Sequence, residues 1–586
     1  MCGIFGYVGT KDNAANMTLA GLKLLEYRGY DSWGIAIKHG KEIAIEKHVG
    51  KIGDASVSLP QSSIGIGHTR WATHGGVTVP NAHPHLDCTK QIAVLHNGII
   101  ENFSQLKEEL IKKGHIFISE TDTEVAAHLI EENLKTLGFA TAVRHAFNRF
   151  KGMNAIVVLY APSKQIVAAK TGSPLVVGKN HDGYYIASDA SGIIKHTRDI
   201  LFLKDNEMII LGDELQLISL PKGEKKTPLF EHVDWNIEEV EKGNFPHFME
   251  KEIHEQPRVI RNIAQNYTDT IQELAAIIKE AKGTFFIGSG TAFHACLVGT
   301  YLFSKLVKKH VNTAAASEFN YLEDFLHEKS LVIALSQSGE TIDVVEPLIR
   351  AKEKKSKIVA ITNTLGSTIY RMADYKILLG AGPEKAVAST KAYVAKLAVL
   401  YLLSFAMTNT YETGKKSLLK AAEEAERLLL DKNVMQMKKI AKLLAKVEHM
   451  YAIGRGVSYP TSMEAALKIK EVSYVHTEGL AGGELKHGTI ALITKGTPCL
   501  VFAPEDDTYE AIISNATEIK ARGGVIIGIS SKKSDIFDHW IEVKHIPYAS
   551  VITHVIPAQL LAYYIALEKG YDPDKPRNLA KSVTVK

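Results

Sequence analysis

An internal repeat constrains the fold of the second half of the chain more than any other feature. A strand-like run at 284–287 leads into a Gly-Ser-Gly turn and a helical pattern, and the run at 450–453, 166 residues later, leads into Gly-Arg-Gly and a second helical pattern. Further strand-like runs follow in each copy, and each copy ends in a long apolar helical stretch. Strands that alternate with helices predict a doubly wound parallel sheet, here present twice.

The two copies differ at the turn after their second strand, where such sheets bind ligands. This turn is Ser-Gln-Ser-Gly-Glu-Thr (336–341) in the first copy and Ala-Pro-Glu-Asp-Asp-Thr (503–508) in the second. Hydroxyl and N–H groups at a helix start attract an anion, whereas three carboxylates repel a phosphate. The first copy is therefore predicted to bind a phosphorylated ligand, although a polar helix-capping turn is the alternative. Neither copy completes G-x-G-x-x-G, which argues against a dinucleotide site.

At the other end of the chain, Cys2 directly follows Met1. Removal of Met1 would leave a thiol and a free α-amine on one residue, and an α-amine with a pKa of about 8 can act as the base for its own nucleophile. Small and apolar residues alternate after Cys2, as in a buried strand. Cys2 is thus a candidate N-terminal nucleophile, and the alternative is an apolar start with an incidental cysteine.

Three more polar positions stand out in the first 220 residues. Arg70 could hold a carboxylate through two hydrogen bonds, or lie on the surface beside a core tryptophan. Asn97 and Gly98, after a strand-like run, could form an oxyanion hole or a plain turn. Asp122, at the start of a helix predicted over 121–134, could hold an ammonium group or cap the helix. Many short β-type runs and two helical segments predict stacked β-sheets between helical layers for this part.

Composition excludes several classes of protein. A length of 586 residues indicates three or four domains, and 69 basic against 65 acidic residues predict neither nucleic-acid nor membrane binding. No run of 18 apolar residues and no basic leader occur, so a cytoplasmic protein is expected. The four cysteines are far apart, and His83 and His85 have no third ligand nearby in the sequence. No disulfide, metal or cofactor is therefore expected.

Five motifs in the first part resemble, in their order, those of the N-terminal-nucleophile glutaminase domain of class II amidotransferases. They are Met-Cys-Gly-Ile-Phe-Gly at the start and the stretches 27–32, 68–75, 96–102 and 121–124. In that family the cysteine thiolate attacks the glutamine side-chain amide, a thioester forms and ammonia leaves. The resemblance implies that Cys2 is nucleophile and base and that Asn97 and Gly98 form the oxyanion hole. The residues implied to surround the bound glutamine are Arg70, Trp71, Thr73, His74 and Asp122.

The second half is similar to tandem sugar-isomerase (SIS) domains, with matching motifs at 387–391, 470–474 and 483–488 and in the tail 576–585. With a glutaminase in front, the order of parts resembles the amidotransferase family that makes glucosamine 6-phosphate from fructose 6-phosphate and L-glutamine, the first step of hexosamine synthesis. The resemblance implies an ammonia channel and a homodimer.

The same resemblance assigns roles around the sugar. Lys581 forms a Schiff base with the C2 ketone, Glu471 moves the proton between C1 and C2, and His487 of a neighbouring subunit assists ring opening. Ala292 departs from the family pattern, which has a serine there. The other residues implied to contact the sugar phosphate are Thr291, Ser336, Gln337, Ser338, Thr341, Val387, Ser389, Lys468 and Ala580.

The expected architecture is therefore α/β and multidomain. Its parts are a glutaminase domain (1–222), a linker (223–245), a first, phosphate-binding SIS domain (246–420), a second SIS domain (421–568) and an active-site tail (569–586). Two rival interpretations stay open. One is a class II amidotransferase with another acceptor, and the other is a non-catalytic sugar-phosphate sensor built on the same scaffold.

Overall fold

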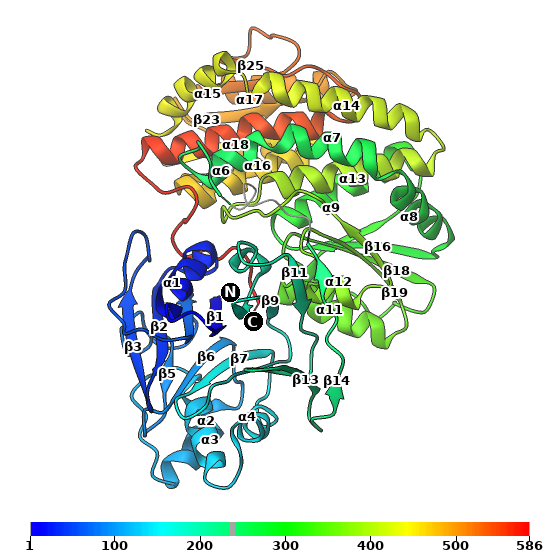
Figure 1. Cartoon of the computed structure of the whole chain (residues 1–586). Coiled ribbons are helices and arrows are strands. Elements are labelled where there is room, and N and C mark those ends of the chain that lie inside the picture. Colours follow the sequence, from blue (N-terminus) through cyan, green and yellow to red (C-terminus); the bar gives the residue numbers. More distant parts are fainter. Residues whose placement is uncertain (1, 234–240, 585–586) are drawn as a thin grey trace. The chain divides into compact units, whose positions relative to one another are not determined.

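A computed structural model describes residues 2–233 and 241–584. The chain divides into two compact units, one comprising Met1–Glu241 with Ala580–Lys586 and the other Lys242–Leu579 (Figure 1). Each unit has its own sheets and its own hydrophobic core, and each is described separately below.

The first unit contains two antiparallel sheets. The eight-stranded sheet has the order β15 (Glu231–His232), β11 (Asp199–Phe202), β9 (Val176–Asn180), β10 (Gly183–Ala187), β1 (Gly3–Gly9), β4 (Ile64–Arg70), β2 (Ser32–His39) and β3 (Glu42–Val49). The seven-stranded sheet has the order β14 (Lys225–Lys226), β13 (Leu215–Ser219), β12 (Glu207–Leu211), β8 (Ile166–Lys170), β7 (Asn154–Tyr160), β6 (Ile92–Gly98) and β5 (His85–Leu86).

The alternation of side chains along β1 shows how these layers form. Ile4 and Val8 join the core cluster between the two sheets, whereas Phe5 and Tyr7 join the cluster formed with helix α1 (Ala14–Leu25). Helices α2 (Phe103–Lys112), α3 (Glu124–Leu134) and α4 (Phe139–Phe147) cover the outer face of the other sheet. The predicted stacking of β-sheets between helical layers is thus confirmed.

The local details differ from the sequence predictions in three places. Helices α2 and α4 were not predicted, although Phe103, Leu106 and Leu110 of α2 are spaced as on one helix face and Leu106 and Leu110 are buried. Helix α3 begins at Glu124 and not at residue 121, and it has no side-chain cap. The Asp122 carboxylate accepts the Ile100 N–H instead of capping the helix. In the stretch expected as a linker, β14 and β15 extend the two sheets.

The second unit contains two parallel sheets of five strands. One has the order β17 (Asn312–Ala315), β16 (Gly283–Gly288), β18 (Ser330–Ser336), β19 (Lys357–Thr362) and β20 (Tyr375–Leu378). The other has the order β22 (His476–Ala481), β21 (His449–Gly454), β23 (Pro498–Phe502), β24 (Val525–Ser530) and β25 (His539–Glu542). The sheets have matching strand orders, so the predicted repeat of a doubly wound parallel sheet is confirmed.

Helices of both repeats share one hydrophobic core. It includes α13 (Lys391–Met407), in which every residue is buried, and α18 (Ser550–Glu568), and it is continuous from one repeat to the other. Helix α18 is long and apolar enough to cross a membrane, with a mean hydropathy of 1.5, but 94% of its apolar window is buried inside the protein. The remaining helices used below are α9 (Thr291–Leu302), α11 (Ile342–Glu353) and α16 (Ser458–Ser473).

Candidate active site

Cys2 directly precedes β1, and its sulfur lies against the backbone of Trp71, the residue that follows β4. The Trp71 N–H donates to Cys2 Sγ at 3.2 Å, and the Trp71 carbonyl oxygen is 3.6 Å from the same sulfur. Burial raises the pKa of the Cys2 thiol, against the opposing effects of the Trp71 N–H and the Arg70 guanidinium. A buried thiol with a raised pKa needs a base close by to become a nucleophile.

The side-chain amide of Asn97 is held in one orientation next to Cys2. Its Nδ2 donates to the Cys2 carbonyl oxygen at 3.0 Å, and its Oδ1 lies 3.1 Å from His68 Nε2. His68 Nε2 also lies 3.2 Å from the His96 carbonyl oxygen, so Nε2 must carry the proton. Burial lowers the pKa of His68 to about 3, which keeps this imidazole neutral and fixes Asn97 with its donor toward Cys2.

Gly98 completes this end of β6. Its φ of 132° is a conformation that residues with a Cβ rarely adopt, and a Cβ there would lie 2.3 Å from the Met153 carbonyl oxygen. Only glycine therefore fits beside Asn97. This geometry fits the predicted pair of oxyanion-hole residues.

The predicted glutamine-binding residues lie on two segments. Arg70 is buried and donates from its two terminal nitrogens to carbonyl oxygens of His74, Gly75 and Gly76, so it holds the loop that follows β4. In that loop Trp71 and His74 are half-buried and Thr73 is exposed. Asp122 is buried before α3, where its Oδ2 accepts the Ile100 N–H at 2.8 Å and lies 3.9 Å from His96 Nδ1.

In the second unit, the predicted phosphate-binding turn follows β18 directly. Ser336 Oγ accepts the Gly339 N–H at 2.9 Å, and Ser338 Oγ accepts the Glu340 N–H at 3.2 Å. Gly339 has a φ of 65°, and a Cβ there would lie 2.0 Å from Ser367 Oγ. The turn leads into α11 at Thr341. The Gln337 carbonyl oxygen accepts the N–H of Asn363, the residue after β19, at 3.1 Å.

Three serine hydroxyls of this unit are buried without a hydrogen-bond partner among the described residues: Ser289, Ser367 and Ser389. Ser289 follows β16, Ser367 follows β19, and Ser389 precedes α13. Buried hydroxyls are normally hydrogen-bonded, so three that lack a partner beside one sheet are consistent with a polar ligand there. Val387 is also buried, and its N–H donates to the Asp574 carbonyl oxygen at 3.1 Å.

A buried ion cluster joins the two repeats. Lys468 on α16 lies 2.6 Å from Glu471 Oε2 and 3.5 Å from Glu464 Oε1, and its Nζ donates to Thr291 Oγ1 on α9 at 3.0 Å. Burial opposes the charge of this lysine, but Glu471 and Glu464 raise the pKa of Lys468 above its usual value. Lys468 is therefore held as the cation beside the Glu471 carboxylate. Ala292, next to Thr291, is buried.

Glu471 also lines a pocket of about 260 Å³ together with the last residues of the second unit. Its other lining residues are Lys470, Tyr474, Arg577, Asn578 and Leu579. The Arg577 N–H donates to the Tyr474 hydroxyl at 2.8 Å, and the Arg577 guanidinium lies 4.2 Å from the centre of the Tyr474 ring. The tail is thus fixed beside Glu471 up to Leu579.

His487 and Lys581, the other two residues predicted to act on the sugar, do not line this pocket. His487 is exposed on a short 3-10 helix, Glu484–His487. Ala580 and Lys581 belong to the first unit by their contacts, whereas Glu471 belongs to the second. The role of Lys581 at the sugar therefore stays a prediction from the resemblance.

Some side chains that hold the candidate site were not singled out from the sequence. His68 orients Asn97, and Asp31 Oδ2 accepts the Ala72 N–H at 2.9 Å and so fixes the loop beside Cys2. Glu464 binds Thr291, His294 and Lys468 at once. The motifs contain His68 and Asp31, but only the folded chain shows what they hold.

Two family models match the chain. One is the glutamine amidotransferase domain, over residues 70–195, and the other is the SIS domain, matched twice, over residues 277–406 and 443–569. Relatives named glutamine–fructose-6-phosphate aminotransferase [isomerizing] match from end to end. The protein of Thermococcus kodakarensis is 42% identical over 606 residues and that of Pyrococcus horikoshii 44% over 605, with both chains fully covered in each case.

Solved structures resemble the second half. The C-terminal domain of glucosamine-fructose-6-phosphate aminotransferase from Francisella tularensis is 30% identical with a TM-score of 0.53, and the match covers 57% of this chain and all of that one. Tagatose-6-phosphate ketose/aldose isomerase from Escherichia coli is 17% identical with a TM-score of 0.50 and 57% and 96% coverage, which shows a shared fold.

Proposed function

Because the chain belongs to the glutamine–fructose-6-phosphate aminotransferase (isomerising) family, we propose that it converts fructose 6-phosphate and L-glutamine to glucosamine 6-phosphate and L-glutamate. The observation that carries this assignment is the end-to-end similarity at 42–44% identity, which includes the amidotransferase part and both SIS parts. The chain is accordingly an amidotransferase with isomerase activity.

In the proposed first reaction, the Cys2 thiolate attacks the side-chain amide of glutamine. The free α-amine of Cys2, present once Met1 is removed, takes the thiol proton. Asn97 Nδ2 and the Gly98 N–H stabilise the oxyanion, and ammonia leaves as the thioester forms. Water then hydrolyses the thioester, which releases L-glutamate and restores the Cys2 thiol. Arg70 binds the glutamine carboxylate and Asp122 its ammonium group, with Trp71, Thr73 and His74 around the substrate.

In the proposed second reaction, ammonia reaches the sugar site without release to solvent. The 336–341 turn binds the phosphate through Ser336, Gln337, Ser338 and Thr341, with Thr291, Val387, Ser389 and Ala580 around the sugar. His487 from the second subunit of a homodimer opens the ring. Lys581 then forms a Schiff base with the C2 ketone as water leaves, and ammonia displaces Lys581 to give the C2 imine. Glu471, which pairs with Lys468 at 2.6 Å, moves the proton from C1 to C2. The whole sequence of steps takes place in the cytoplasm and uses no cofactor.

Two rival activities are distinguishable from this one. An amidotransferase with another acceptor would release glutamate without making amino sugar. A sugar-phosphate sensor would bind fructose 6-phosphate without turnover. The buried Lys468, whose pKa is raised and which pairs with Glu471 beside a pocket, favours catalysis, because a sensor needs no such ion pair at its ligand site.

The first test is product identification with protein whose N-terminus has been checked by mass. We expect equal amounts of glucosamine 6-phosphate and glutamate from glutamine and fructose 6-phosphate. Cys2→Ala should abolish synthesis from glutamine and keep synthesis from ammonium salts, because only the first reaction needs the thiol. Glutamate without amino sugar in the unmodified protein, or glutamine use by Cys2→Ala, would contradict the proposal.

A further inference from the structure

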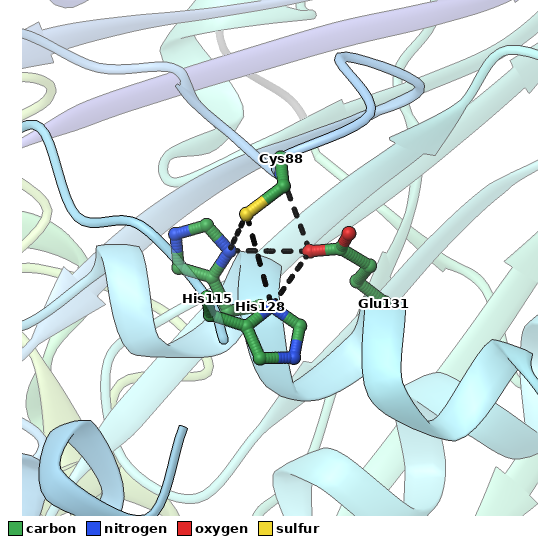
Figure 2. A group of neighbouring side chains, drawn as sticks. All are labelled: Cys88, His115, His128 and Glu131. Atoms are coloured by element: carbon green, nitrogen blue, oxygen red, sulfur yellow. Dashed lines mark hydrogen bonds and ion pairs between the residues drawn. The ribbon is translucent and has the colours of Figure 1, made fainter. Parts of the chain in front are cut away.

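Four side chains with metal-binding atoms converge at a surface of the first unit, away from Cys2 in the sequence and unused by the proposed reactions. They are Cys88, His115, His128 and Glu131 (Figure 2). Each presents one ligand atom to a common centre, and these atoms all lie within 4.8 Å of one another. We propose that these four residues bind one zinc ion, as a structural site with a complete set of protein ligands.

The distances between the ligand atoms fit a tetrahedral zinc ion. Cys88 Sγ lies 3.8 Å from His115 Nδ1 and 3.5 Å from His128 Nδ1. Glu131 Oε2 lies 3.0 Å from His115 Nδ1 and 3.2 Å from His128 Nδ1. Usual zinc bond lengths give tetrahedral edges of about 3.6 Å between sulfur and nitrogen and about 3.4 Å between nitrogen and oxygen. The site therefore needs only small shifts of side chains to accept the ion.

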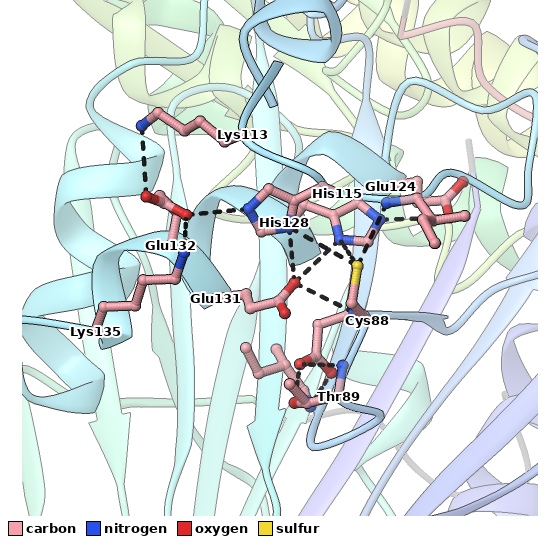
Figure 3. A network of polar contacts seen from close by, with 12 residues as sticks. Cys88, Thr89, Lys113, His115, Glu124, His128, Glu131, Glu132 and Lys135 are labelled. Atoms are coloured by element: carbon pink, nitrogen blue, oxygen red, sulfur yellow. Dashed lines mark hydrogen bonds and ion pairs between the residues drawn. The ribbon is translucent and has the colours of Figure 1, made fainter. Parts of the chain in front are cut away.

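The second nitrogen of each histidine faces a carboxylate, as in zinc sites whose ligands are held from behind. His115 Nε2 lies 3.1 Å from Glu132 Oε2, and His128 Nε2 lies 3.6 Å from Glu124 Oε1 (Figure 3). Both imidazoles thus present Nδ1 to the centre. Glu132 is in turn paired with Lys135 at 2.6 Å and with Lys113 at 3.6 Å. The carboxylates fix the rings without occupying the centre.

The donor set selects a metal of the zinc type. One thiolate, two imidazoles and one carboxylate combine soft and borderline donors, which suit zinc, whereas calcium and magnesium prefer oxygen ligands alone. Two of the ligands, His128 and Glu131, are one turn apart on α3. On binding, Cys88 loses its proton to solvent and the imidazoles bind as neutral groups. Cys88 is exposed, so the ion has a direct path from solvent.

The ion would connect three segments of the first unit. Cys88 lies in the turn between β5 and β6, His115 lies after α2, and His128 and Glu131 lie on α3. The chain between His115 and α3 includes Asp122, the proposed partner of the glutamine ammonium. Four protein ligands leave no open position on a tetrahedral ion, so the site stabilises structure and does not catalyse. We expect metal loss to loosen this segment.

The histidine pair that stands out in the sequence, His83 and His85, was not expected to bind a metal because no third ligand lies near it in the sequence. His83 and His85 are buried, but His85 Nε2 bonds to Thr121 Oγ1 at 3.1 Å and His83 Nε2 lies 3.5 Å from Thr123 Oγ1. These nitrogens already have hydroxyl partners. The proposed site uses other residues, which the sequence separates by up to 43 positions.

The test begins with the metal content of the full-length protein as purified. We expect about one zinc ion per chain, and about one cobalt ion after removal by a chelator and reloading with Co²⁺. Cobalt should give the strong visible bands of a tetrahedral site and a near-ultraviolet thiolate-to-metal band. In Cys88→Ser the thiolate band should vanish, and metal affinity should fall at least tenfold. If Cys88 is not a metal ligand, the cobalt spectrum of Cys88→Ser should equal that of the unmodified protein.

Glu132→Gln provides a second variant, which changes a half-buried residue behind His115 and leaves all four ligands in place. We expect its zinc affinity to fall about 10- to 100-fold, because His115 loses the carboxylate that holds it. Glu108→Gln, on an exposed position of α2, is the matched control and should bind zinc like the unmodified protein. The chelator should also lower the Tm of the unmodified protein and of Glu108→Gln.

Two results would overturn the proposal. One is a protein that neither contains nor takes up zinc or cobalt at this site, in which case the four residues form only a hydrogen-bonded network. The other is equal metal binding by the unmodified protein and Cys88→Ser. Both readouts are independent of amino-sugar synthesis, so failure of the proposed function would leave the result on the metal intact.

Discussion

At the scale of single residues, His68 decides which way the Asn97 amide points. Replacement by leucine removes the Nε2–H donor, so Asn97 can turn its oxygen toward Cys2. We expect His68→Leu to lower kcat for glutamine hydrolysis about tenfold, a part of the usual cost of losing an oxyanion-hole donor, with KM for glutamine nearly unchanged. The measurement is steady-state glutamate release at several glutamine concentrations.

His68→Gln is the conservative counterpart, because its amide can still donate to Asn97 Oδ1. We expect it to recover most of the activity that His68→Leu loses. The neutral state of His68, with its pKa lowered to about 3 by burial, also means that His68 causes no inflection in the pH–rate profile near neutrality. Equal loss in both variants, or a change in KM alone, would show that His68 does not act by orienting Asn97.

At the scale of elements, α18 contains a polar residue that its packing does not satisfy. His554 is buried, and neither ring nitrogen has a hydrogen-bond partner among the described residues. Burial, with His545 nearby, lowers the pKa of His554 to about 3. An unfolded histidine takes up a proton below about pH 6.5, so this group makes the folded state less stable as the pH falls from about 6.5 toward 3.

His554→Leu should therefore weaken the acid sensitivity of the fold. We expect its Tm at about pH 8 to equal or exceed that of the unmodified protein, and its decrease between about pH 8 and about pH 5.5 to be smaller. Thermal unfolding at both pH values measures this. His310→Asn, at an exposed position, is the control and should behave like the unmodified protein. If Tm depends on pH in the same way in His554→Leu, burial of His554 is not a cause of the acid sensitivity.

At the scale of the whole molecule, the proposed reaction needs two subunits for one sugar site. Glu471→Gln and His487→Ala should each be inactive alone. If His487 acts in the partner's site, a mixed dimer has one site with both residues intact, so an equal mixture that exchanges subunits should regain about a quarter of full activity. Amino-sugar synthesis before and after subunit exchange measures this. No recovery in a mixture shown to exchange would place His487 and Glu471 in the same subunit.

Much of the architecture followed from local patterns. The strand–turn–helix repeat predicted two parallel sheets, and the short β-type runs predicted stacked sheets, because period-2 and period-3.6 patterns and glycine turns are read over a few residues. The candidate residues Cys2, Asn97 and Gly98 came from motifs in the same way. Helix α2 was missed although Phe103, Leu106 and Leu110 are spaced as on one helix face, so the omission was not forced by the sequence.

Tertiary structure alone decided which side chains meet. His68 holds Asn97, Lys468 joins α16 to α9, and Cys88 meets His115, His128 and Glu131, although nothing in the local sequence around any of them predicts the partner. By itself the sequence determined the sheets, their order of appearance and the chemistry available at their ends. Which of these groups come together depends on how the sheets stack and the loops close over distances of tens of residues, and no local periodicity records that.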